Sequence, residues 1–121
     1  GVIRISNPLL TVADLVQYQQ HVGGLSRVAT ILEELSDQID IKTQFSPLTS
    51  YVKKVVWQRL GYLLENILEE NELADELFEQ LLALPGAILY QPLSTSAKND
   101  STERDTRWKL NINVQIETDD I

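Results

Sequence analysis

Residues 52–68, VKKVVWQRLGYLLENIL, carry a long helical pattern. Their apolar residues recur at spacings of three and four, which is typical of a broad buried face on an α-helix. Thr49 or Ser50 is expected to cap this helix, because a hydroxyl at that position accepts a hydrogen bond from a free backbone N–H. Gly61 lies inside the helix, where glycine costs roughly 1 kcal/mol relative to alanine. We therefore expect another element to pack closely against Gly61.

Three further segments show the same periodicity: Pro8 to the glycine turn at 23–24, Leu25 to Gln38, and Asn71 to Pro85. Asn7 precedes the first of them, and its side chain can accept from a free N–H while Pro8 fits the first helical position. Asn71 is expected to cap the last helix, which Pro85-Gly86 then stops. The sequence thus predicts about four helices.

The strand candidates are residues 2–5, 87–90 and 108–117. Residues 108–117 alternate strictly between apolar and polar, and Pro92 places the preceding strand at a sheet edge. Residues 94–106 contain almost nothing apolar and are predicted to form a mobile loop. A strand with one polar face is typical of an antiparallel sheet that is covered on its other side. The predicted fold class is α+β, with about four helices packed on a small, mainly antiparallel, three-stranded sheet.

Length and composition indicate a single domain over residues 1–121. The chain has 121 residues, of which 43% are hydrophobic, and this is enough for one continuous core. Gly1 and the absence of methionine indicate that the chain is part of a longer protein. Cysteine is also absent, and no apolar run approaches the roughly 18 residues of a membrane span. We expect a cytoplasmic protein that does not enter a membrane.

The charge balance is acidic, with 18 acidic and 10 basic residues and a formal net charge of -8. Nucleic acid is therefore a poor sole partner for this domain unless its few cations are clustered. Lys53, Lys54 and Arg59 form the only cationic concentration on a predicted helix. These three residues are candidates for contact with phosphate, and the alternative is a solvated helix surface.

Acidic residues are concentrated between Leu60 and Ala97, where the sequence has seven of them and no basic residue. Five would share one helix face if the helix continued through Asn71: Glu65, Glu69, Glu72, Glu76 and Glu79. We interpret this row as a solvated face. A divalent metal or a cationic partner is the alternative, although a carboxylate metal site in a helical bundle would want inward-pointing Glu-x-x-His pairs.

The sequence shows no pattern that indicates catalysis, a cofactor or a metal. It has no Ser-His-Asp order, no phosphate loop and no zinc spacing. His21 has no orienting carboxylate or nucleophile that the sequence identifies. Gly23-Gly24 before Ser26 and Arg27 could hold an anion at a helix start, although two glycines more often only turn the chain. We predict a protein that is not an enzyme. An enzyme or metal protein remains the alternative if a pocket joins His21 to at least two carboxylates.

Four short stretches carry a resemblance to a known family: TVADLVQY at 11–18, GGLSRVAT at 23–30 leading into LEEL at 32–35, QRLGYLLE at 58–65, and RWKL at 107–110 with Asn113. In this order they resemble the AbiEi family of antitoxins, and they extend from residue 11 to residue 113. The chain is similar to the C-terminal part of such proteins.

The resemblance implies a function for the domain. In the complete proteins an N-terminal winged helix-turn-helix segment binds the operon's own promoter DNA, and a C-terminal domain counteracts a nucleotidyltransferase-like toxin. The pairs act in abortive phage infection and are grouped as type IV, in which stable contact between toxin and antitoxin is not assumed. We therefore expect an antitoxin domain without chemistry of its own. The alternative is a regulatory or dimerisation domain that orients the DNA-binding segment.

The resemblance also gives the charged residues possible roles. Arg27, Gln58 and Arg59 are polar residues within apolar motifs, so we expect them to bond backbone carbonyls, with a binding patch as the alternative. Lys53, Lys54 and Arg59 are the candidates for assisting promoter binding. Among the acidic residues of 69–76, Glu69, Glu72 and Glu76 are the candidates for competing with nucleic acid for a basic toxin surface.

Overall fold

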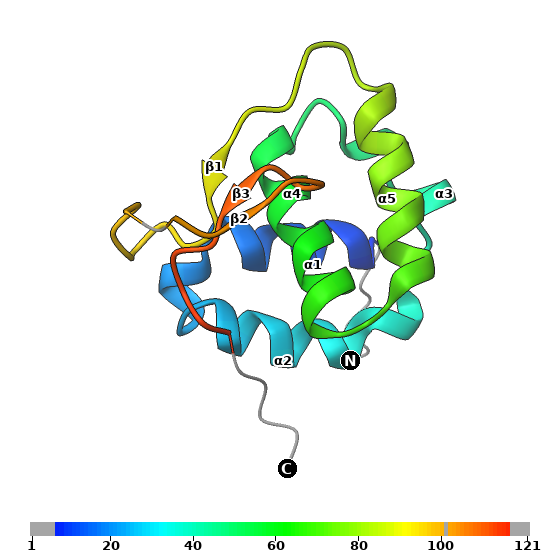
Figure 1. Cartoon of the computed structure of the whole chain (residues 1–121). Coiled ribbons are helices and arrows are strands. Elements are labelled where there is room, and N and C mark those ends of the chain that lie inside the picture. Colours follow the sequence, from blue (N-terminus) through cyan, green and yellow to red (C-terminus); the bar gives the residue numbers. More distant parts are fainter. Residues whose placement is uncertain (1–6, 101, 117–121) are drawn as a thin grey trace.

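A computed structural model of the chain describes residues 7–100 and 102–116, which form a group of helices with a small sheet at one side (Figure 1). The α-helices of this part are α1 (Pro8–Gln17), α2 (Leu25–Leu35), α3 (Ile41–Gln44), α4 (Lys54–Tyr62) and α5 (Asn71–Ala83). The strands are β1 (Gln91–Pro92), β2 (Arg104–Asp105) and β3 (Leu110–Asn111). Short 3-10 or π turns extend the helices: η1 (Gln19–Val22), η2 (Ser36–Gln38), η3 (Ser46–Leu48) and η4 (Leu63–Ile67). The α+β class is confirmed, with five α-helices where about four were predicted.

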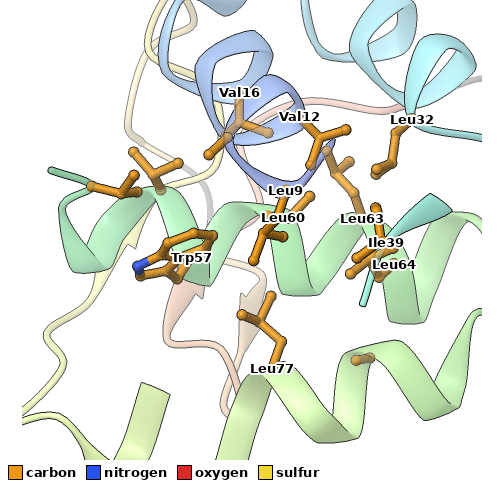
Figure 2. Packing of buried hydrophobic residues seen from close by; sticks show 14 of the residues in the cluster. Leu9, Val12, Val16, Leu32, Ile39, Trp57, Leu60, Leu63, Leu64 and Leu77 are labelled. Atoms are coloured by element: carbon orange, nitrogen blue, oxygen red, sulfur yellow. The ribbon is translucent and has the colours of Figure 1, made fainter. Parts of the chain in front are cut away.

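Helix α4 lies at the centre of the core. Figure 2 shows Leu60 of α4 and Leu63 of η4 on the side of α1, while Leu77 of α5 approaches from the other side. Leu60 of α4, Leu63 of η4 and Val12 of α1 have no exposed surface. Burying one such side chain stabilises the fold by about 1.5–3 kcal/mol. The central position of α4 explains why its sequence is apolar on more than one face.

The first two helices begin as their sequence predicts. The Asn7 side chain accepts a hydrogen bond from the backbone N–H of Leu10 at 3.1 Å, so the predicted cap of α1 is confirmed. Gly23 and Gly24 have φ values of 97° and 91°, a left-handed region in which a side chain would be strained. Helix α2 starts directly after this turn and continues through η2 to Gln38, as predicted.

The start of α4 differs from the prediction. Thr49 and Ser50 do not cap the helix, because the N-cap position is taken by Lys53, without a side-chain hydrogen bond. The Thr49 hydroxyl donates instead to the carbonyl of Ser46 at 3.2 Å and so closes the turn before it. Residues 41–48 also fold into α3 and η3, two short helical elements that were not predicted.

The connection between α4 and α5 interrupts the helix. Helix α4 passes into the π turn η4, and Glu69 then takes a left-handed conformation with φ of 57°. The N-cap of α5 is Glu70, and the prediction that Asn71 caps this helix is wrong because Asn71 is its first residue. The two helices are therefore separate elements that pack against each other.

Trp108 fills the space above Gly61. A Cβ atom at position 61 would lie 2.1 Å from the Trp108 ring, closer than carbon atoms can approach. Trp108 itself is fully buried. The predicted close packing at Gly61 is thus confirmed, and it joins α4 to the C-terminal part of the chain.

The sheet is mixed, with the strand order β1-β3-β2. Leu110 pairs in parallel with Gln91 and antiparallel with Asp105. The prediction of a mainly antiparallel sheet is therefore wrong. Pro92 does lie in an edge strand, as expected, because proline has no N–H to donate to a further strand.

The strand boundaries also differ from the predictions. Residues 87–90 are not a strand, and pairing begins only at Gln91. Residues 94–106 contain β2 and not only a loop. Within 108–116 only Leu110–Asn111 is paired, since Lys109 has a φ of 53° that interrupts an extended chain. The strand predicted over residues 2–5 lies outside the described residues.

Candidate partner-binding surfaces

Two polar residues of α4 hold the C-terminal segment against the helices. The Gln58 amide donates to the carbonyls of Leu89 and Trp108, both at 2.9 Å, and to that of Lys109 at 3.3 Å. Gln58 is only 2% exposed. Three carbonyls from two segments of the chain thus converge on one side chain, and the Lys109 carbonyl also accepts from the backbone N–H of Gln91.

Arg59 has a comparable role beside Gln58. Its Nε donates to the carbonyl of Pro92 at 3.0 Å, and the residue is 7% exposed. Burial lowers the pKa of Arg59 below its ordinary value. The expectation that these polar residues bond backbone carbonyls is confirmed for Gln58 and Arg59.

Lys53 and Lys54 differ in their surroundings although they are adjacent. Lys53 is exposed at the N-cap of α4. The Lys54 ammonium donates to the carbonyl of Pro85, at the end of α5. With Arg59 buried, the three cations of this group do not form one exposed cluster, and Lys53 is the most accessible of them.

Arg27 is exposed on α2, where it follows the turn formed by Gly23 and Gly24. Its aliphatic carbons approach Gly23, which accounts for part of its packing. His21 is also exposed and lies near the ring of Tyr18, with 6.4 Å between the ring centroids.

The acidic row predicted over residues 65–79 is divided by the break between η4 and α5. A helix running through Asn71 would place Glu65, Glu69 and Glu72 on one face, but Glu69 lies at a left-handed turn. The predicted alignment is therefore wrong. Glu69 and Glu72 are exposed and Glu76 is half-buried, so these three carboxylates still lie at the surface of the same turn and helix.

Glu65 is partly buried and bonded to other side chains, so it is not part of a solvated row. One of its oxygens accepts from the indole N–H of Trp108 at 2.7 Å, and the other pairs with Arg107 at 2.6 Å. The residue sits in the π turn η4, a local geometry that often marks a specialised position in a helix. Glu65 thus links the central helix to the residues that cover Gly61.

Arg107 is a connecting residue that the sequence analysis did not identify as a site residue. It pairs with Glu65 and, at 2.8 Å, with Asp75 of α5, while its guanidinium lies 4.5 Å from the centroid of the Phe78 ring. Burial acts to lower the pKa of Arg107, but its hydrogen bonds to Asp75 and Glu65, and the charges of both, raise the pKa overall. In the sequence, Arg107 belongs to the RWKL stretch at 107–110. This stretch indicated the family but did not predict the contacts of Arg107 with Glu65 and Asp75.

Tyr90, Arg104 and Lys109 form a second group that was not predicted from the sequence. Tyr90 lies between two cations, with Arg104 at 5.0 Å and Lys109 at 5.1 Å from its ring centroid. On the inner side, burial and then the charges of Asp105 and Glu103 raise the pKa of Tyr62. Arg104 thus lies against the Tyr90 ring, while the negative charges of its neighbours Glu103 and Asp105 act on Tyr62.

Within residues 7–100 and 102–116, no pocket opens at the surface and no group of histidine and acidic side chains is arranged to hold a metal ion. The pocket that would have favoured an enzyme or metal protein, with His21 beside two carboxylates, does not occur in this part of the chain. None of the helices described has the length and apolar character needed to span a bilayer.

The comparison with protein families gives one match. The model described as AbiEi antitoxin C-terminal domain matches residues 1–66, which is more than half of the chain. No curated protein and no solved structure matches the chain. The matched stretch ends inside η4, so it includes the central helix and leaves α5 and the sheet outside.

Proposed function

Since this chain belongs to the family of AbiEi antitoxin C-terminal domains, and so has an antitoxin role in a toxin–antitoxin system, we propose that it neutralises a nucleotidyltransferase-like toxin. The observation that carries the proposal is the family match over residues 1–66. The motifs at 58–65 and 107–110 add support, because they supply Gln58, Glu65 and Arg107, which join the matched helices to the rest of the domain.

In the proposed mechanism the domain either contacts the toxin or antagonises its effect, and it catalyses no reaction of its own. The system would be of type IV and would act in abortive phage infection, with the protein working in the cytoplasm. The buried polar groups support a passive role, because Gln58 and Arg59 are occupied with backbone carbonyls. Glu69, Glu72 and Glu76 are available at the surface to meet a basic toxin.

Growth rescue is the test of this function. Cells that express the cognate toxin are expected to resume growth when residues 1–121 are co-expressed, and expression of the toxin alone is the reference. Persistent growth arrest with the domain present in soluble form would count against the antitoxin assignment. Charge reversal at Glu69, Glu72 and Glu76 tests the acidic surface separately, and unchanged rescue would remove that surface from the mechanism.

A second candidate function is regulatory, and the exposure of Arg27 and Lys53 favours it. In this function the domain assists a winged helix-turn-helix segment of the full protein at its own promoter, through phosphate contacts. Full-length protein with Arg27→Glu and Lys53→Glu is expected to bind promoter DNA more weakly and with a smaller salt dependence. Unchanged binding in a gel-shift titration would contradict this role.

A further inference from the structure

Tyr90 lies close to two cationic side chains that have no anionic partner among the described residues. The Arg104 guanidinium carbon lies 5.0 Å from the centroid of the Tyr90 ring, and the Lys109 ammonium nitrogen lies 5.1 Å from it. In the part of the chain that the structure describes, the ion pairs all belong to Arg107, and neither Arg104 nor Lys109 donates a side-chain hydrogen bond. Their N–H groups are therefore open to an acceptor from another molecule. We refer to Tyr90, Arg104 and Lys109 as the cationic cluster.

Hydrogen bonds fix the backbone that carries the cationic cluster. The buried Gln58 amide donates to the carbonyl of Leu89, directly before Tyr90, and to the carbonyl of Lys109. Lys109 has a φ of 53°, a left-handed conformation that few residues other than glycine adopt. Arg104 lies in β2, which pairs with β3 directly after Lys109. The three positions are therefore fixed before any ligand binds, and an ordered surface loses less conformational entropy on binding.

The acidic neighbours of Arg104 are directed away from the cluster. Asp105 pairs in register with Leu110, which is fully buried, so Asp105 lies on the side of the sheet that faces the core. Successive side chains of a strand point to opposite sides, which places Arg104 on the other side. Burial, and then the charges of Asp105 and Glu103, raise the pKa of Tyr62. Residues 80–99, which lead into and follow β1, contain no acidic residue, so the charge beside the cluster is positive although the chain is acidic.

The open surface around the cluster favours one class of ligand. No pocket opens in the described part of the molecule, whereas a free nucleotide is normally bound in a concave site that encloses most of it. A single strand of nucleic acid can instead lie across an open sheet, where cations contact its phosphates and an aromatic ring contacts a base. Tyr90 is 38% exposed, so part of its ring is open to a base. A duplex keeps its bases paired, and an acidic peptide offers carboxylates but no base to contact Tyr90.

We propose that the cationic cluster binds a single strand of nucleic acid, with Arg104 and Lys109 on neighbouring phosphates and Tyr90 against a base. This site goes beyond the proposed antitoxin function. It requires no contact with a toxin, so it is compatible with the type IV grouping. It is also separate from the duplex contact at the promoter, for which Arg27 and Lys53 are the candidates.

Fluorescence anisotropy tests the proposal with the purified chain and labelled oligonucleotides of about 12 nucleotides, which suit one small binding surface. The probes are an oligouridine RNA, an oligothymidine DNA and a DNA duplex, at low salt because the chain is acidic. Arg104→Ala and Lys109→Ala are each expected to weaken single-strand binding by about tenfold. Tyr90→Leu is expected to weaken it by about fivefold or more.

Lys42→Ala is the matched control. Lys42 is an exposed lysine of α3, which Figure 1 shows on the opposite side of the molecule from the sheet. Circular dichroism and melting curves establish that each variant folds. A variant that does not fold is replaced by Arg104→Gln or Lys109→Gln, which remove the charge and keep more of the side chain.

Salt dependence distinguishes phosphate contacts from a general loss of structure. Each cation variant should reduce the slope of the logarithm of affinity against the logarithm of salt concentration by about 0.7, and Tyr90→Leu should leave this slope unchanged. These results, with Lys42→Ala binding as the unmodified chain does, support the site. Binding of either the RNA or the DNA strand supports it, and the tighter of the two identifies the ligand.

Four results would overturn the proposal. The first is no binding of either single strand at low salt, and the second is an equal loss of binding in Lys42→Ala. The third is a duplex that binds as tightly as the single strands. The fourth is a polyglutamate peptide that displaces the strands at equal concentration, which would assign the cluster to carboxylates.

Discussion

Residues 8–67 and residues 87–116 both bury large side chains, but different interactions fix them in place. In the first region, helices α1, α2 and α4 meet through aliphatic side chains such as Val12 and Leu60 (Figure 2). In the second, two-residue strands are held to α4 by Gln58 and Arg59, whose side chains donate to backbone carbonyls. The comparison shows that one helix can organise two regions, through aliphatic contacts in the first and, in the second, through hydrogen bonds together with the packing of Trp108 on Gly61.

The loss of apolar packing in the helical region is expected to have the largest effect. Leu60→Ala removes a fully buried side chain of α4 and should lower the free energy of unfolding by about 2–5 kcal/mol. Urea denaturation followed by circular dichroism measures the change. Leu82→Ala, at an exposed position, is the control and should change stability by less than about 0.5 kcal/mol. Similar losses for both would contradict the central position of Leu60.

The loss of the Gln58 amide is expected to act mainly on the C-terminal region. Gln58→Leu keeps the approximate size of the side chain but leaves the carbonyls of Leu89 and Trp108 without this donor, at a cost of about 1–3 kcal/mol. Amide hydrogen exchange should become faster in residues 89–111 than in α1. Gln17→Leu, at an exposed position of α1, is the matched control. Equal acceleration in both regions would indicate that the two are not separable.

The ion pairs of Arg107 are expected to contribute less. Arg107 is 32% exposed and Asp75 is 63% exposed, so solvent screens their attraction, and the coupling between Arg107 and Glu65 should stay below about 1 kcal/mol. A double-mutant cycle with Arg107→Lys and Glu65→Gln measures it, since glutamine still offers an acceptor to Trp108. The coupling should decrease at high salt. A coupling that is larger and independent of salt would show that this pair acts as a buried one.

The smallest effect is expected from the ionisation of Tyr62. Burial, and then Asp105 and Glu103, raise its pKa above the ordinary value of 10.0, so the folded protein keeps the phenol proton to higher pH than the unfolded chain does. This contribution to stability is complete below about pH 10 and is lost as the pH rises through the folded pKa. Tyr62→Phe should flatten the pH dependence of unfolding above about pH 10. Ultraviolet titration of the phenolate, with Asp105→Asn as a second variant, checks the cause, and an unshifted titration would contradict it.

The same contrast explains which parts of the fold the sequence predicts. Helix α1 follows from Asn7 and Pro8 because capping and φ restriction act within a few residues. The packing of Trp108 on Gly61 was expected because an interior glycine is costly in a helix unless something approaches it closely. These features depend on local chemistry, and the sequence displays them directly.

The sheet was harder to predict because its strands are defined by distant partners. The apolar alternation from Trp108 suggests a long strand, but Lys109 is left-handed and pairing is limited to two residues. Asn113 then replaces strand pairing with its amide, which accepts from the N–H of Ser94 at 2.8 Å and donates to the Ser94 carbonyl at 3.0 Å. Because the Asn113 side chain takes the place of a paired backbone here, the contact produces no alternation of apolar and polar residues that the sequence could show.

The candidate contact residues were predicted only in part. Lys53 and Arg27 are exposed as a contact residue should be, whereas Arg59 is buried among backbone carbonyls. A count of charges in the sequence cannot separate these three residues. Their exposure depends on which face of α4 meets the C-terminal segment, and the sequence does not show this. Arg107 was not predicted as a site residue, because its partners Glu65 and Asp75 lie on other elements that are distant in sequence.

The outer edge of β1 has a consequence for how the protein behaves at high concentration. The N–H groups of Gln91 and Leu93 donate to the carbonyls of Lys109 and Asn111, while Pro92 between them has no N–H and its carbonyl accepts from Arg59. An edge without a free donor or acceptor at this position offers no template for a strand from another molecule. The chain can therefore keep a leucine such as Leu89 in solvent next to a sheet edge that is protected against fibrillar aggregation.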